Sequence, residues 1–206
     1  MTNETARIEA FSDGVFAVAI TLLVLDIKAP PVSSASPSLA VRLAHQWPSY
    51  LAFVTSFVTI LIMWVNHHRI FTHIGRANDH LLFFNGMLLL GVTVVPFSTA
   101  LIAEYLGHDG QRTAAVVYNG TFIFIAILYN VLWHSASAKG KLLRQDADHH
   151  AVQLITGSFR WGVPGYSAAL MFAFLNVTAS LVLNLLLAMF FALPTHLSRR
   201  RNSNAH

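Results

Sequence analysis

A group of charged and polar side chains opens the first apolar segment of the chain. Arg7 and Phe11 are four residues apart and share one face of a helix, whereas Arg7 and Asp13 are six residues apart and lie on different sides. The two charges therefore cannot simply neutralise each other, and we expect each to have a partner on another helix. A simpler interpretation stays open, in which Arg7 is an anchor at the membrane surface and Ser12 and Asp13 suit a first helical turn.

The same segment carries a stripe of aliphatic side chains. Val18, Leu22 and Leu25 follow one another at steps of four and three residues, which puts them on one helical face, and Thr21 adjoins them. Such a stripe is usually a packing face. It is also the pattern of a hydrophobic constriction, which gates some pores by dewetting. Periodicity alone does not decide between the two.

Two adjacent histidines, His67 and His68, lie near the end of the second apolar run. Neighbouring residues point about 100° apart on a helix, so this pair does not suit one metal ion, and the sequence has no HExxH motif. We expect no metal site. Hydrogen bonds to Arg7 or Asp13 across helices are the preferred interpretation, and titration near neutral pH is the alternative.

The remaining residues predict no catalytic site. The sequence contains no nucleophile paired with a base, no Gly-rich phosphate loop and no paired carboxylates within an apolar run. It also contains no cysteine, which excludes disulfides and thiolate metal sites. We therefore expect neither an enzyme nor a cofactor or small-molecule substrate.

The composition is that of a membrane protein. Of the 206 residues 55% are hydrophobic and 11% are charged, whereas about a quarter of the residues in a soluble domain are charged. The net charge of +4 does not indicate nucleic-acid binding, because the basic residues form short clusters between apolar runs. The composition therefore predicts a polytopic membrane protein, with the lipid bilayer as its surroundings.

A membrane crossing needs about 20 apolar residues, and the apolar runs of this chain suffice for six crossings. We expect them to form one domain, residues 1–206, without a soluble domain. A short helix is expected over Leu39–His45 in the loop after the first crossing. The last two crossings share one long apolar run, which we divide near Asn176. The expected all-α spans are residues 6–29, 47–72, 80–104, 113–137, 154–175 and 178–195.

The basic residues predict the orientation of these spans. Three of them fall on one side of the membrane, namely Lys28, Arg42 and Arg112. Nine fall on the other side: Arg7, Arg69, Arg76, Lys139, Lys141, Arg144, Arg199, Arg200 and Arg201. By the positive-inside rule this places both termini in the cytoplasm, with the chain in the cell membrane.

The segment from Arg7 to Leu25, with its RxxxFSD pattern, resembles the signature first helix of the transmembrane protein 175 family. These proteins are potassium channels of endolysosomes and of many prokaryotes. Looser matches follow in the same order along nearly the whole chain, at Trp64–Arg69, Leu82–Asn85 and Val95–Ala100.

The resemblance implies a homotetramer of six-span subunits around a central pore that the first helix lines. Animal members carry two such units, and the single unit here is similar to prokaryotic members. The family's ladder of apolar constriction residues falls on Val18, Leu22 and Leu25, and its conserved threonine falls on Thr21. One departure is Val18, because this position is usually Ile or Leu, and a smaller side chain loosens the ring.

The family's RxxxFSD residues hold the cytoplasmic half of the first helix against its neighbours, and here they are Arg7, Phe11, Ser12 and Asp13. With no TVGYG segment to form a carbonyl filter, the sequence predicts a potassium-selective leak-type channel with a hydrophobic constriction and K⁺ as the permeant ion. The alternatives are a proton-conducting channel of the same architecture and a secondary cation transporter. A membrane protein with a purely structural role is the simplest alternative.

Overall fold

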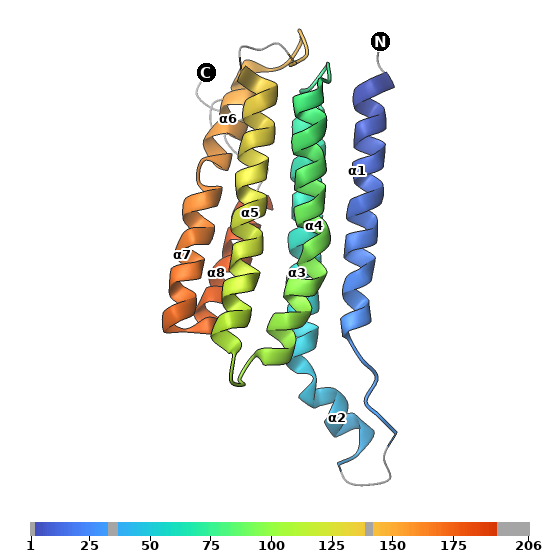
Figure 1. Cartoon of the computed structure of the whole chain (residues 1–206), viewed down its shortest axis with the longest axis vertical. Helices are drawn as coiled ribbons and strands as arrows, with labels where there is room; N and C mark the ends of the chain where they lie inside the picture. Colours follow the sequence, from blue (N-terminus) through green and yellow to red (C-terminus); the bar gives the residue numbers. More distant parts are fainter. Residues whose placement is uncertain (1–2, 33–36, 139–141, 193–206) are drawn as a thin grey trace, which may run out of the picture.

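The computed structural model describes residues 3–32, 37–138 and 142–192, and it is a bundle in which α1, α3, α4 and α5 alternate in direction, α6 and α7 follow each other in one direction, and α8 returns in the opposite one (Figure 1). The first helix, α1, lies at one side of the bundle, and the α6, α7 and α8 helices lie at the other side. The elements are α1 (Asn3–Leu22), the 3-10 helix η1 (Leu23–Asp26), α2 (Leu39–His45), α3 (Trp47–Phe71), α4 (Asp79–Tyr105), α5 (Gln111–Ser137), α6 (His149–Phe159), α7 (Gly162–Leu175) and α8 (Val177–Ala192).

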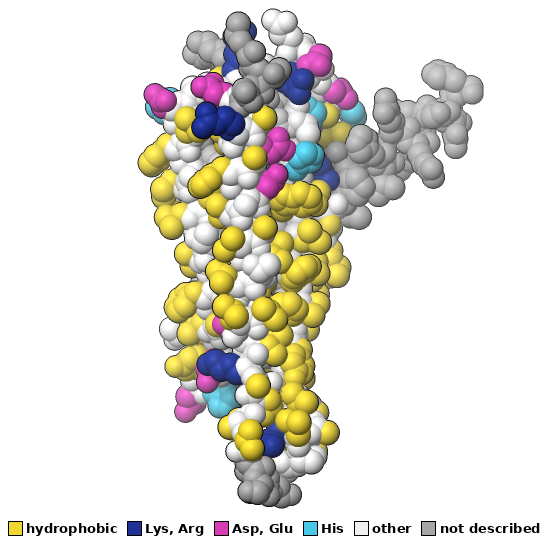
Figure 2. All heavy atoms as spheres, turned by 90° about the vertical axis from the view of Figure 1, so that its right-hand side faces the viewer, with side chains coloured by type: hydrophobic (Ala, Val, Ile, Leu, Met, Phe, Trp, Pro, Cys, Tyr) yellow, Lys and Arg dark blue, Asp and Glu magenta, His cyan; other side chains and the backbone are white. Residues whose placement is uncertain are grey.

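Four helical segments are long and apolar enough to cross a membrane. They overlap the first four spans predicted from the sequence and comprise Glu4–Asp26, Trp47–Phe71, Asp79–Tyr105 and Gln111–Ser137. Figure 2, which views the molecule from the side of α1, shows a broad apolar band between two ends where most charged side chains gather. The chain is thus an all-helical integral membrane protein.

The first span ends earlier than predicted. The sequence suggested a helix over residues 6–29, but the α-helix ends at Leu22 and a 3-10 turn continues only to Asp26. Ile27 is already extended, and its backbone N–H closes the turn on the Val24 carbonyl at 3.1 Å. Pro30 explains why no helix continues, because a proline has no N–H to donate and disfavours helical geometry in the residue before it.

The predicted span over residues 154–175 is divided into two helices. α6 ends at Phe159 and α7 begins at Gly162. Pro164 accounts for this break, since it has no N–H for the Arg160 carbonyl and its ring clashes with that group in a continuous helix. The Asn130 amide of α5 donates to the Phe159 carbonyl at 3.0 Å and so satisfies one of the freed groups.

The second break lies at Asn176, where the sequence placed it. Asn176 is extended between α7 and α8, and its side-chain oxygen accepts a hydrogen bond from the Ala179 N–H at 3.0 Å. This is an ordinary helix N-cap. α8 ends at Ala192, so residues 193–195 of the last predicted span lie outside the described residues.

Close helix contacts form the core. α4 and α5 are in close contact at Gly91, where an added Cβ would lie 2.9 Å from Cγ1 of Ile125. α5 and α8 share a buried polar contact, in which the Asn119 amide donates to Ser180 Oγ at 3.0 Å and the Asn184 amide donates to Asn119 Oδ1 at 2.9 Å. α1 packs against α3 and α4, which leaves its other side free in one copy of the chain.

Candidate functional site

The first helix has one buried and one exposed face. Its buried face consists of side chains that are at most 1% exposed, namely Ser12, Phe16, Ala19 and Leu23. Its exposed face carries large apolar side chains that are 43% to 68% exposed, namely Phe11, Val18, Leu22 and Leu25. α1 thus has apolar residues on two faces. One face is packed inside the subunit, and the other stays exposed in a single copy of the chain.

The 3-10 turn changes the alignment of the exposed stripe. Leu25 lies in η1, whereas Leu22 is the last residue of α1. Side chains three residues apart eclipse each other in a 3-10 helix, so Leu22 and Leu25 lie closer to one line than an α-helix would place them. Thr21 is exposed beside them, and its hydroxyl donates to the Val18 carbonyl at 2.9 Å. The oxygen of that hydroxyl keeps lone pairs for water or a cation.

Two pairs of side chains join α1 to α3. The Trp64 indole N–H donates to Asp13 Oδ1 at 2.7 Å, and His68 Nδ1 lies 2.5 Å from Glu9 Oε1. On each helix the two partners are four residues apart and therefore share a face. The two contacts form consecutive rungs between the helices.

A buried chain of hydrogen bonds joins α1, α4 and α3. Ser12 Oγ donates to the Ile8 carbonyl at 2.8 Å and accepts from the Asn85 amide at 3.0 Å. Asn85 Oδ1 lies 2.8 Å from His67 Nε2. The His67 ring is stacked on Phe71 with 4.4 Å between centroids. These contacts hold the half of α1 that precedes the apolar stripe.

The two histidines thus have different environments. His67 is completely buried, whereas His68 is exposed and faces Glu9. Neither histidine contacts Arg7 or Asp13 through a hydrogen bond, which differs from the interpretation preferred from the sequence. Among the described residues no group of three or more histidines and carboxylates could hold a metal ion.

The charged residues of the RxxxFSD segment behave differently from one another. Asp13 has a partner on another helix, but this partner is the neutral indole of Trp64. Arg7 is exposed and has no hydrogen bond or ion pair within the described part of the chain. Sequence reasoning did not single out Trp64 or Glu9. The matching four-residue spacings, Glu9 to Asp13 and Trp64 to His68, were the available signal.

The chain is similar to a family of ion channels and to two bacterial proteins named as potassium channels. Residues 7–96 match the family model described as endosomal/lysosomal potassium channel TMEM175. The chain is 52% identical to a potassium channel of Chamaesiphon minutus over 94% of this chain and 96% of that protein. It is 41% identical to a potassium channel of Streptomyces collinus over 92% of both chains.

More distant relatives carry a different name. The chain is 31% identical to the human endosomal/lysosomal proton channel TMEM175, over 63% of this chain and 27% of that protein. Among solved structures, a lysosomal potassium-selective channel TMEM175 homologue from Chamaesiphon minutus matches with a TM-score of 0.84 and 47% identity, covering 98% of this chain and 99% of that one.

Proposed function

Because the chain belongs to the TMEM175 family, we propose that it is a potassium channel whose pore is lined by α1 in an assembly of four copies. The family resemblance of the Arg7–Asp13 segment is confirmed by these relatives. They are named as ion channels, so the expectation that the chain is not an enzyme is confirmed as well.

The exposed apolar face of α1 carries this proposal. One α1 at the side of a bundle cannot enclose a pore, but copies arranged around an axis bring Val18, Leu22 and Leu25 of each subunit together as three rings. The opposite face of α1 is packed on α3 and α4, which supports an arrangement in which the stripe faces the axis. The relatives named potassium channels support the same assignment.

Each subunit then crosses the membrane six times. α7 alone has 14 residues, or about 21 Å at 1.5 Å per residue, which is less than the hydrocarbon thickness of about 30 Å. We therefore assign α6 and α7 together to the fifth crossing. α8, whose 16 described residues span about 24 Å, forms most of the sixth. Both termini lie on the cytoplasmic side, the side with more basic residues.

Selectivity would come from dehydration at the narrow rings. Potassium loses its hydration shell more readily than sodium, so a tight constriction with few ligands favours potassium. Thr21 offers an oxygen beside the rings. Val18 is smaller than the Ile or Leu usual at its position, so its ring is the widest of the three and Leu22 and Leu25 provide most of the barrier.

The contacts around Ser12 and Asp13 would set the position of these rings. They connect α1 to two helices of its own subunit through Trp64 and Asn85. A change in either contact would rotate or shift the stripe. This is the role we assign to the RxxxFSD residues, with Arg7 and Phe11 on the exposed side available to neighbouring subunits.

Proton conduction by the same architecture is a second candidate function. The observation that favours it is the name of the animal relatives, which are endosomal/lysosomal proton channels. His67 and His68 are the titratable side chains beside α1 that could take part. A secondary cation transporter finds no support among the named relatives.

Ion flux into liposomes tests the proposal. Purified protein is reconstituted and exposed first to a potassium gradient and then to a matched sodium gradient. We expect potassium flux that exceeds sodium flux. Flux that follows only an imposed pH gradient would select proton conduction, and no flux from protein shown to be tetrameric would contradict a leak-type channel.

A further inference from the structure

A crevice lies within the subunit, between α3, α5, the α6–α7 break and α8. Its inner part is a cavity of about 50 Å³ with mainly aliphatic and aromatic walls, including Met63, Ile125, Tyr166 and Ala188. Its outer part shares Asn66, Phe159 and Phe191 with the inner part and adds Arg69 and Ser158. The helix break brings Phe159 and Gly162 to the wall of the inner cavity. This crevice is separate from α1 and its exposed stripe.

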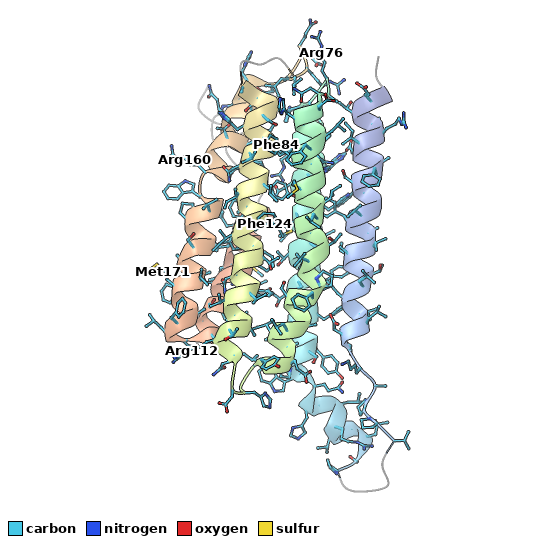
Figure 3. All side chains as sticks on the ribbon, viewed as in Figure 1. Arg76, Phe84, Arg112, Phe124, Arg160 and Met171 are labelled. Atoms are coloured by element: carbon cyan, nitrogen blue, oxygen red, sulfur yellow. The ribbon has the colours of Figure 1, made fainter. Side chains whose placement is uncertain are left out.

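The outer part of the crevice holds a cation without a counter-ion. Arg69 is partly buried in the last turn of α3, and its guanidinium donates to Asn66 Oδ1 of the same helix at 3.2 Å. No carboxylate lies within ion-pair distance of it in the described ranges. A partly desolvated charge without compensation is unfavourable. The side chain of Arg160 does not contribute a second positive charge to the crevice, since it is exposed and points away from the bundle (Figure 3).

The inner part of the crevice holds a hydroxyl without a partner. Tyr166 is 7% exposed and lines the cavity, with its ring stacked 5.6 Å from that of Phe122. Its hydroxyl makes no hydrogen bond to any described residue and is therefore available to a ligand in the cavity. In contrast, the amides of Asn66 and Asn130 already donate to the Phe191 and Phe159 carbonyls.

We propose that this crevice binds an anionic phospholipid of the surrounding bilayer. The phosphate pairs with Arg69, an ester oxygen accepts from Tyr166, and the start of one acyl chain occupies the apolar cavity. Charge complementarity carries the assignment, because the crevice presents one unpaired cation and no anion. The order of groups also fits, since Arg69 lies at the charged end of α3 and the apolar cavity lies deeper, as a phosphate and its acyl chain do in a bilayer.

Native mass spectrometry of the purified, delipidated full-length protein tests this site. Phosphatidylglycerol and phosphatidylcholine with identical acyl chains are added in equal amounts, and the lipids retained per subunit are counted. We expect one phosphatidylglycerol per subunit, retained about tenfold better than phosphatidylcholine. Both lipids offer a phosphate to Arg69, but the choline cation beside the phosphate of phosphatidylcholine offsets much of its attraction to the guanidinium. Equal retention of the two lipids by the wild-type protein would overturn the proposal without any variant.

Four substitutions locate the site. Arg69→Gln should abolish the preference for phosphatidylglycerol, and Tyr166→Phe should weaken retention of both lipids while the cavity keeps its shape. Arg76→Gln is the matched control, because Arg76 is exposed in the α3–α4 loop, and it should change neither. Loss of the preference in Arg160→Gln instead of Arg69→Gln would place the lipid on the outer surface and overturn the assignment.

A final arm separates a lipid from a free anion. Inorganic phosphate is added in excess to protein that carries phosphatidylglycerol. We expect the lipid to remain bound, because the cavity contributes apolar contacts that phosphate lacks. Displacement of the lipid by phosphate alone would show an anion site without lipid specificity. Conductance is not needed for any of these measurements, so the result is independent of the proposed channel function.

Discussion

The indole of Trp64 reaches the Asp13 carboxylate at 2.7 Å, and this contact attaches α1 to α3 just before the apolar stripe begins. Replacing Trp64 by Phe keeps an aromatic ring and removes the donor. We expect the assembly to lose about 1–2 kcal/mol of stability per subunit, the cost of an unmade hydrogen bond to a charged group. Thermal unfolding of the purified protein measures the loss.

Trp47 provides the control for this change. It is 58% exposed at the start of α3, and its indole makes no hydrogen bond within the described residues. Trp47→Phe should leave the unfolding temperature nearly unchanged. Equal unfolding temperatures for the two variants would show that the Trp64–Asp13 contact contributes nothing to the assembly.

Leu22 is the residue that best tests the pore. Leu22→Ala should widen a ring of the constriction, raise leak conductance several-fold and reduce the preference for potassium over sodium, because a wider ring admits hydrated ions. Liposome flux under matched gradients is the measurement. Leu186→Ala on α8, where the side chain is similarly exposed, should leave both quantities unchanged. Unaltered flux from folded Leu22→Ala protein would make the stripe a packing face.

His73, just after α3, makes stability depend on pH. Burial lowers its pKa below the ordinary 6.5, and Asp148 opposes this effect. The unfolded chain therefore binds more protons, so the contribution of His73 to stability is complete above pH 6.5 and decreases as the pH falls toward its folded pKa. His73→Gln should show a shallower fall in unfolding temperature between pH 7.5 and 5.5 than the wild-type protein.

At the scale of the helices, the α4–α5 contact depends on a small residue. An added Cβ at Gly91 would lie 2.9 Å from Cγ1 of Ile125 and 3.3 Å from the Phe124 ring. Gly91→Ala should therefore destabilise the protein by about 1–3 kcal/mol, the usual cost of overpacking, despite the better helix propensity of alanine. Thermal unfolding again gives the measurement.

Gly86 in the same helix is the matched control, since a Cβ there would meet nothing within 4 Å. Gly86→Ala should be neutral or slightly stabilising. If Gly91→Ala and Gly86→Ala unfold at the same temperature, α4 and α5 accommodate the added methyl group at Gly91, and the close contact does not limit stability.

The α6–α7 break is the other feature of helix scale. One proline, Pro164, and one compensating amide, Asn130, convert a predicted straight crossing into two helices with a cavity beside them. The break thus makes room for a ligand without leaving the Phe159 carbonyl unpaired.

At the scale of the whole molecule, the assembly can be tested with cysteines, because the chain has none of its own. A disulfide needs Cα atoms within about 7 Å, a distance that residues reach only close to a shared axis or interface. We expect Leu22→Cys to form disulfide-linked pairs of chains on mild oxidation and Leu186→Cys to remain unlinked. Light scattering should give a mass of four 22.7 kDa chains. Linked pairs only in Leu186→Cys would place α8, not α1, at the interface.

The sequence by itself determined the membrane class, the positions of four long apolar helices, the break at Asn176 and the family. These features are local, because they depend on run length, on helical periodicity and on residue types such as Asn and Pro. The periodicity also predicted the aliphatic stripe from Val18 to Leu25. It did not decide whether the stripe is a packing face or a pore constriction.

The tertiary structure decided which residues become partners. Trp64 lies 51 residues from Asp13, and Asn85 lies 73 residues from Ser12, so no local pattern specifies these contacts. The burial of His67 beside the exposed His68, the crevice at Arg69 and Tyr166, and the free face of α1 have the same origin. Each depends on which helix lies opposite a given face, and that is set by the packing of all the helices together.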